Sequence, residues 1–228
     1  TDVTIFDKVN YIGDYSFSNC ANLTGITIPH SVNHIGLYVF YCCAELTTAT
    51  IGNNVAFISN YAFSSCTGLT TVIIGDLAAS IGYSAFSYCY NLTNITIGIG
   101  IKIIDYYAFY YCTSLATINI PDSVTSIIFC SFSYCSNLKN VNLSNNLESI
   151  GNYIFYGCTS LETITIPDSV KIIGYSAFSS CSGLATIVIP CNVTHINNYA
   201  FAQCISLTNI TINDGVTTIG DESFTTCT

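Results

Sequence analysis

The sequence has few charged residues, and basic residues are the scarcest of them. Only 7% of the 228 residues are charged, with four lysines, no arginine and a formal net charge of −9. A typical globular domain carries about 25% charged residues. Proteins recognise nucleic acids and anionic membranes through basic patches. The composition therefore argues against nucleic acid and anionic membrane surfaces as partners.

Methionine is absent, and no apolar run is long enough to cross a bilayer. A transmembrane helix needs about 20 predominantly apolar residues, so we expect no membrane insertion by this segment. The first residues show no signal-peptide pattern. We interpret the sequence as an excised or processed piece of a longer product. Neither end resembles the atypical polar cap that usually closes a repeat protein.

The sequence does contain a 23-residue repeat that runs through the whole chain without insertion or deletion. The pattern I-G-x-x-x-F-x-x-C-x-x-L-x-x-I-x-I-P-x-x-V-x-x begins at Ile12 and returns every 23 residues up to Ile219. Internal periods of this length are typical of solenoids, in which each unit buries its apolar face against its neighbours. We therefore predict a single domain over residues 1–228, with nine full units and a partial unit at each end.

Each unit predicts one short strand. The I-x-I pair at positions 15 and 17 alternates with polar residues, as a half-buried strand does, and equivalent strands would stack in parallel about 4.8 Å apart. Proline or glycine at position 18 ends the strand. The segment before the cysteine, such as Ala108–Cys112, is expected to form a tight helical turn or a bend. Glycine at position 2 of six units predicts a positive φ there.

The unit I-G-x-x-A-F-x-x-C-x-x-L-x-x-I-x-I-P-x-x-V resembles the BspA-like, or Treponema-type, leucine-rich repeat over essentially every residue from 1 to 228. The resemblance implies an α/β leucine-rich-repeat solenoid with a parallel β-sheet on its concave face. Members of that family occur on bacterial and protozoan cell surfaces, where they adhere to host matrix, to other cells or to other microbes. The resemblance thus implies a cell-surface or secreted location.

Ten cysteines occupy position 9, at a spacing that suits neither zinc nor disulfides. They are Cys20, Cys43, Cys66, Cys89, Cys112, Cys135, Cys158, Cys181, Cys204 and Cys227. Zinc motifs place pairs of ligands two to four residues apart. Stacked turns separate equivalent Cβ atoms by about 4.8 Å, whereas a disulfide needs about 3.8 Å. We predict a buried, reduced row whose thiols donate weakly to backbone carbonyls. Cys42, Cys130 and Cys191 fall at unrelated positions.

Histidine and aspartate form no catalytic or metal-binding pattern. His34 and His195 share position 23 but lie seven turns apart, and no acidic residue repeats beside His30. The aspartates at position 19 are Asp76, Asp122, Asp168 and Asp214. We expect them to form Asx-type turns by bonding their own backbone. Because no Ser-His-Asp set or phosphate-binding glycine loop can be assembled, we predict no enzyme activity, no cofactor and no metal.

Two rows of small polar side chains are expected on the outer side of the strands, at positions 14 and 16. The candidate ligand-binding residues on this concave face are Thr48, Thr50, Thr71, Asn94, Thr96, Thr117, Asn119, Asn140, Asn142, Thr163, Thr165, Thr186, Asn209 and Thr211. We call this surface the Thr/Asn face. Threonine also has a high β propensity on any solvent-facing strand. Because extended solenoid faces commonly bind partners, the pattern leaves a structural role and a binding role both open.

We predict a non-enzymatic binding or adhesion module that presents the Thr/Asn face to a protein or glycan, such as host matrix or another cell. The alternative is a structural protein whose units stack end to end into a fibre or a longer solenoid. The strand expected at Asp2–Ile5 would leave one edge unpaired, and the turn around Phe224 would leave Ile219 uncovered. Because the two ends are different surfaces, head-to-tail self-association would propagate as a filament.

Overall fold

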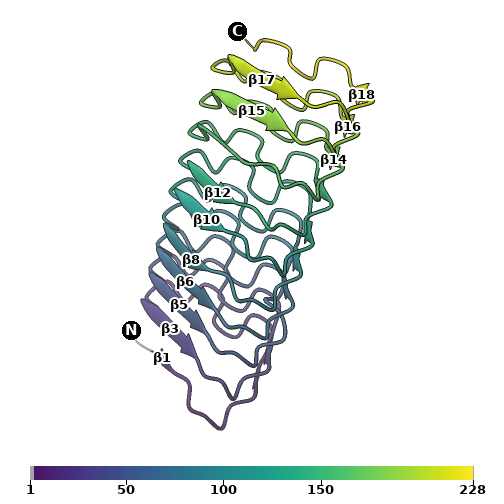
Figure 1. Ribbon diagram of the computed structural model, residues 1–228. Helices are drawn as coiled ribbons and strands as arrows, with labels where there is room; N and C mark the ends of the chain where they lie inside the picture. Colours follow the sequence, from purple (N-terminus) through teal and green to yellow (C-terminus); the bar gives the residue numbers. More distant parts are fainter. Residues whose placement is uncertain (1–2, 228) are drawn as a thin grey trace.

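The chain winds into an elongated column of stacked turns, described by a computed structural model for residues 3–227. Figure 1 shows the N-terminus at the lower end of the column and the C-terminus at the upper end. Each turn is one repeat unit, because strand pairing joins residues that are 23 positions apart, such as Thr50 and Ile73. The predicted parallel solenoid is confirmed.

Two ribbons of parallel strands run along the column, one more than the sequence predicted. The first ribbon contains β1 (Val3–Thr4), β3 (Gly25–Ile28), β5 (Thr48–Ile51), β6 (Thr71–Ile74), β8 (Asn94–Thr96), β10 (Thr117–Asn119), β12 (Asn140–Asn142), β15 (Thr186–Ile189) and β17 (Asn209–Ile212). The second contains β2 (Tyr11–Ile12), β4 (His34–Ile35), β7 (Ser80–Ile81), β9 (Ile103–Ile104), β11 (Ser126–Ile127), β13 (Ser149–Ile150), β14 (Ile172–Ile173), β16 (His195–Ile196) and β18 (Thr218–Ile219). Asp2, the start of the predicted first strand, lies outside the described residues.

The core consists of continuous rows of identical side chains along the axis of the column. The position 6 phenylalanines from Phe40 to Phe201 are fully buried. From Phe17 to Phe224 their rings stack with centroids 5.0–5.8 Å apart and interplanar angles of 2–18°. Fully burying a phenylalanine contributes about 1.5–3 kcal/mol. The repeat therefore distributes its stability evenly along the column.

The segment between positions 2 and 9 consists of turns in the described residues and contains no helix. This corrects the α/β description, and of the two predicted alternatives it favours a bend over a tight helical turn. The amide of Tyr38 donates to the carbonyl of Asn60 in the next turn, whereas the amide of Tyr41 donates back to Tyr38, both at 3.1 Å. An α-helix would direct every amide to the carbonyl four residues earlier. Here amides at positions 4, 6 and 8 join adjacent turns, and those between them close local turns.

Positive φ occurs at positions 4 and 8, not at position 2 as predicted. The nineteen non-glycine residues at these positions have φ of 50–61°, and Gly157 at position 8 has φ of 72°. The glycines at position 2 serve another purpose, which is the close approach of successive turns. A Cβ on Gly36 would lie 2.4 Å from the amide nitrogen of Asp14, and one on Gly174 would lie 2.6 Å from the carbonyl carbon of Gly151.

Candidate binding faces

The Thr/Asn face is formed by the outward side chains of the first ribbon. In β5, Ala49 and Ile51 are buried, whereas Thr48 and Thr50 are exposed. The same alternation continues along the column, as expected where successive side chains of a strand point to opposite sides. All the predicted ligand-binding residues are exposed except Thr71, which is half-buried. The structure therefore brings the predicted residues together on one side of the column (Figure 1).

Strand register aligns these residues into two rows parallel to the axis of the column. The pairs on this face include Thr48 with Thr71, Thr71 with Asn94, Thr117 with Asn140, Asn119 with Asn142, and Thr186 with Asn209. Two apolar residues interrupt the position 16 row. Ile73 is 44% exposed and Val188 is 55% exposed. The face is thus mostly hydroxyl and amide, with an isolated aliphatic contact in two turns.

The Thr/Asn face is not one continuous sheet. β8 ends one sheet and β10 begins another, and residues 163–166 are not a regular strand. Thr163 and Thr165 are nevertheless exposed while Ile164 and Ile166 are buried, so the alternation persists. A hollow of about 440 Å³ opens beside this turn, and its lining includes Thr163, Thr165, Thr186 and Val188.

The polar side chains at position 19 join one turn to the next. Asp76 Oδ1 accepts a hydrogen bond from the amide of Ile99 at 3.2 Å, and Asp122 Oδ1 accepts one from the amide of Asn145 at 2.9 Å. These bonds reach across turns, which corrects the predicted Asx-type turns at these two aspartates. His30 has the same role, because its Nδ1 accepts from the amide of Asn53 at 2.9 Å.

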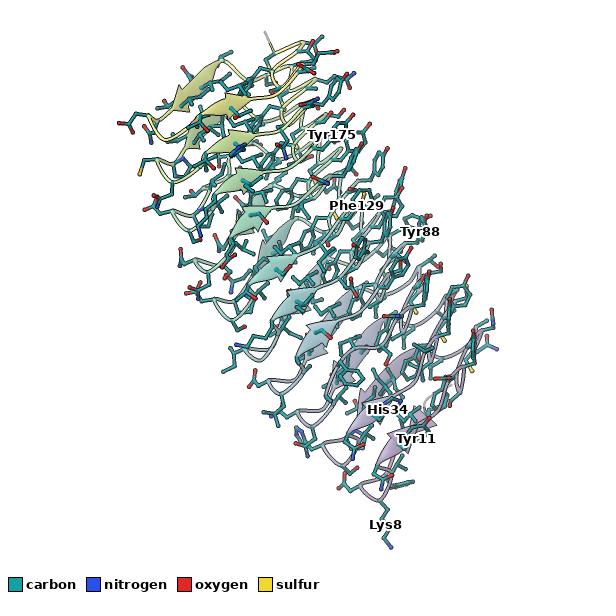
Figure 2. The ribbon with its side chains drawn as sticks, turned by 90° about the vertical axis from the view of Figure 1, so that its right-hand side faces the viewer. Lys8, Tyr11, His34, Tyr88, Phe129 and Tyr175 are labelled. Carbon is teal, nitrogen blue, oxygen red and sulfur yellow. The ribbon has the colours of Figure 1, made fainter. Side chains whose placement is uncertain are left out.

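The other histidines lie in separate environments. His34 stacks on Tyr11 with ring centroids 4.8 Å apart, near one end of the column (Figure 2). His195 Nδ1 lies 2.8 Å from Thr194 Oγ1. Within residues 3–227, no three His, Cys, Asp or Glu side chains gather closely enough to hold a metal ion. In the same range, no helix is long and apolar enough to cross a membrane.

The position 9 cysteines pack as the predicted row. From Cys43 to Cys204 they are buried, and each Sγ donates to the carbonyl of a phenylalanine in the preceding turn, as Cys112 does to Phe86 at 3.2 Å. The two terminal members, Cys20 and Cys227, are half-buried. Burial raises the pKa of the Cys135 thiol to about 12. Protonated thiols react poorly, so Cys135 serves packing. At Cys43, by contrast, a hydrogen bond with Cys66 lowers the pKa of the thiol.

A tyrosine-rich surface, which the sequence analysis did not identify, lies over positions 3, 4, 7 and 8. Tyr88, Phe129 and Tyr175 mark it along one edge of the column in Figure 2. A hollow of about 470 Å³ opens in this surface, and we call it the tyrosine notch. It is lined by Tyr38, Tyr41, Tyr61, Ser64, Ser65, Tyr83, Ser84, Ser87, Tyr88, Tyr107 and Tyr110.

The notch arises from the residues that occupy position 7. Tyr41 and Tyr110 occupy this position at the two ends of the notch, and Ser64 and Ser87 occupy it in the two turns between them. The small serines leave the volume that two tyrosine rings would fill. Ser64 Oγ lies 2.9 Å from Ser87 Oγ, which in turn donates to the carbonyl of Ser84 at 3.1 Å. This alternation of tyrosine and serine along the column was the available signal in the sequence.

The tyrosine rings of the notch pack against one another. Tyr38 and Tyr61 stack nearly parallel at 4.5 Å, while Tyr41 meets Tyr38 edge-on at 5.6 Å. Partial burial, followed by the influence of neighbouring tyrosines, raises the pKa of Tyr61 and of Tyr110 to about 12. The phenols are therefore neutral at physiological pH. No charged side chain lines the notch.

A second hollow, of about 420 Å³, lies further along the same surface. Tyr156 bounds it at position 7, and Ser179 and Ala202 form its floor, so it has the same origin as the tyrosine notch. It differs in charge, because Glu222 contributes a carboxylate that accepts a hydrogen bond from the Tyr199 hydroxyl at 3.0 Å. That hydrogen bond raises the pKa of Tyr199.

Comparison with known proteins places the repeat in a family. The family described as BspA type Leucine rich repeat region (6 copies) matches residues 1–116 and 102–228. A leucine-rich repeat protein from Eubacterium ventriosum has a similar crystal structure, with a TM-score of 0.73 and 24% identity, over 100% of this chain and 64% of that chain. A Treponema pallidum leucine-rich repeat protein has a TM-score of 0.61 and 23% identity, over 77% of this chain and 72% of that chain.

These two structural likenesses concern the fold alone. No curated protein sequence is significantly similar to this chain. The family match covers the described residues from end to end. The chain therefore belongs to the BspA-type leucine-rich-repeat family.

Proposed function

We propose that this chain is a non-enzymatic binding module that uses the Thr/Asn face to adhere to a protein or glycan at a cell surface or outside the cell. The observation that supports the proposal is the register, which aligns exposed threonine and asparagine side chains in two long rows. Extended repeat surfaces of this kind commonly bind partners. Family membership is consistent with such a role.

The chemistry of the Thr/Asn face suits an uncharged, hydrogen-bonding partner. Threonine hydroxyls and asparagine amides both donate and accept hydrogen bonds. Their side chains are short, so little rotamer entropy is lost when a ligand orders them. The apolar contacts at Ile73 and Val188 add area in two turns. Partners with repeated hydroxyl or amide groups, such as glycans or extended proteins, fit this description.

Lysine substitution of the central rows tests the proposal. We expect a variant carrying Thr96→Lys, Asn119→Lys, Asn142→Lys and Thr165→Lys to lose adhesion to host cells or matrix, because long charged side chains cover the polar rows. All four residues are exposed, so the fold should persist. Circular dichroism and a cooperative unfolding transition would establish that it does, and adhesion would be measured on immobilised matrix.

A matched control adds the same charge outside the Thr/Asn face. Ala56, Ala79, Thr125 and Ser149 are exposed beside or within the second ribbon. Lysine at these four positions should leave adhesion unchanged. Full adhesion by the folded Thr/Asn variant would contradict the proposal. Equal losses in the two variants would contradict it as well, because they would reveal a general effect of charge.

A further inference from the structure

We propose that the tyrosine notch is a second binding site, and that it takes an uncharged, proline-rich segment of another protein in the polyproline II conformation. This site is independent of the function proposed for the Thr/Asn face. It lies over positions 3, 4, 7 and 8 of the repeat, whereas the Thr/Asn face uses positions 14 and 16. Either site can therefore be removed without touching the other.

The notch has the composition of an aromatic groove that recognises extended peptides. Proline-rich segments dock into grooves lined by aromatic side chains, and they lose little entropy because the polyproline II helix is preformed. Six tyrosines supply the walls of the notch between Tyr38 and Tyr110, with Tyr88 beside them at 39% exposure. A volume of about 470 Å³ is within the usual range for a binding site.

The hydrogen-bonding groups of the notch match those of such a ligand. Proline has no amide hydrogen, and a polyproline II helix has no internal hydrogen bonds, so its carbonyls need donors from the partner. The backbone amides of Tyr61, Ser65 and Tyr107 already donate to carbonyls of the next turn. The donors left in the notch are phenol hydroxyls, because the Ser87 hydroxyl donates to the carbonyl of Ser84 and the Ser64 hydroxyl bonds to Ser87. The phenols keep their protons because the pKa of Tyr61 and Tyr110 is about 12.

The length of the notch accommodates a short peptide. A polyproline II helix advances about 3.1 Å per residue. Tyr41 and Tyr110 are three turns apart, and the stacked phenylalanine rings beside them lie 5.0, 5.3 and 5.5 Å apart from one turn to the next. The end walls therefore limit a stretch of about 16 Å, or about five prolines.

Other ligand classes fit the notch less well. Anions lack a cationic partner, because no lysine lines it and the chain has a net charge of −9.

Filling the floor of the notch is the sharpest test, because the repeat itself supplies the replacement residue. We expect Ser64→Tyr with Ser87→Tyr to weaken binding of a fluorescent peptide of about nine prolines at least tenfold, as followed by anisotropy on the full chain. Tyrosine occupies the same position at Tyr41, Tyr110 and Tyr156. Ser133→Tyr makes the same substitution at position 7 outside the notch, and it should leave the affinity unchanged.

Two further variants keep the test decisive if the filled notch does not fold. Tyr41→Ser with Tyr110→Ser removes the end walls and introduces the residue found at position 7 in other turns. It should weaken binding of the peptide at least tenfold. Tyr88→Phe with Tyr110→Phe keeps the rings and removes two donors of the notch lining, which should weaken binding about two- to tenfold per hydroxyl. A peptide of equal length in which glycine replaces alternate prolines should bind more weakly than polyproline.

Three outcomes would overturn the proposal. The first is no binding of the polyproline peptide to the folded wild-type chain. The second is equal affinity for the wild-type chain and for the folded variants with a filled or opened notch. The third is binding of a neutral oligosaccharide such as cellohexaose in the notch, lost on filling it, without binding of the peptide. That third result would assign the notch to a glycan.

Discussion

The Thr/Asn face and the tyrosine notch are two surfaces of the same repeat, yet they differ in how the backbone makes them. On the Thr/Asn face an extended backbone alternates side chains in and out, so most turns present two short polar groups, with Ile73 and Val188 as apolar exceptions. In the segment that forms the notch, backbone amides alternately donate hydrogen bonds within local turns and to the next turn of the solenoid. The residues at positions 4 and 8 have a left-handed conformation. The first surface is therefore uniform, whereas the second varies with each side chain.

This difference has a consequence for binding. A uniform row offers many weak and equivalent contacts, which suit avidity along an extended partner. A notch made where serine replaces tyrosine offers one bounded site with fixed walls. Position 7 sets the ends and the floor of this notch, because Tyr41 and Tyr110 close it and Ser64 and Ser87 open it. A single repeat can thus carry both a tolerant surface and a selective one.

The core that supports both surfaces should be far more sensitive than either of them. Phe109→Ala removes one ring from the buried row between Phe86 and Phe132, where the ring centroids lie 5.5 and 5.2 Å away. We expect it to lower the free energy of unfolding by about 3–5 kcal/mol and to loosen adjacent turns. Denaturant unfolding measures the loss. Thr117→Ala, on the exposed Thr/Asn face, should change it by less than about 0.5 kcal/mol.

Similar losses for Phe109→Ala and Thr117→Ala would contradict a core made of stacked rings. Hydrogen exchange adds the spatial information. Amides of the turns that contain Phe86 and Phe132 should exchange faster in the Phe109→Ala variant, because each turn is supported only by its neighbours. Amides at the far ends of the column should keep their protection.

The sequence predicted one surface well and missed the other for physical reasons. The I-x-I alternation reports directly on an extended strand, so the exposed rows at Thr48 and Thr50 followed from it. Left-handed residues have no comparable signal here, since these positions hold mostly tyrosine and serine, and glycine only at Gly157. Glycine at position 2 was expected because of a positive φ. The structure shows that it is required by the close approach of successive turns, as at Gly36. The notch becomes apparent only when the residues at position 7 are compared from one unit to the next.

Alkaline pH should lower the stability of the fold through the tyrosines of the notch and the buried thiols, and not through the Thr/Asn face. Burial raises the pKa of Cys135 and Cys204 to about 12, and burial together with neighbouring tyrosines raises that of Tyr61 and Tyr110 to about 12. In the unfolded chain these groups ionise near pH 9 to 10. The folded state therefore holds more protons above that range, and stability is lost as pH rises from about 9 towards 12. Thermal unfolding across this range measures the loss.

Tyrosine variants show which surface is responsible. Tyr61→Phe with Tyr110→Phe should make the decline in melting temperature between about pH 9 and 12 shallower, because two groups with raised pKa are removed. Thr96→Val on the Thr/Asn face should leave the slope of the decline unchanged, since it removes no titrating group. A melting temperature independent of pH in this range would contradict the neutral, partly buried phenols on which the notch depends.

Glycine scanning gives the smallest expected effect and the most direct comparison of the two backbones. Ser65 borders the notch with φ of 61°, a conformation that costs an L-residue about 1–2 kcal/mol relative to the right-handed region. Ser65→Gly relieves that cost but adds about 0.4–1 kcal/mol of entropy to the unfolded chain. We therefore expect a change in unfolding free energy between zero and about 1.6 kcal/mol of stabilisation. Thr50→Gly, in strand β5, relieves nothing and loses β propensity, so it should destabilise by about 1 kcal/mol. Denaturant unfolding of both variants measures the difference, and an equal loss at the two positions would mean that the left-handed residues carry no strain.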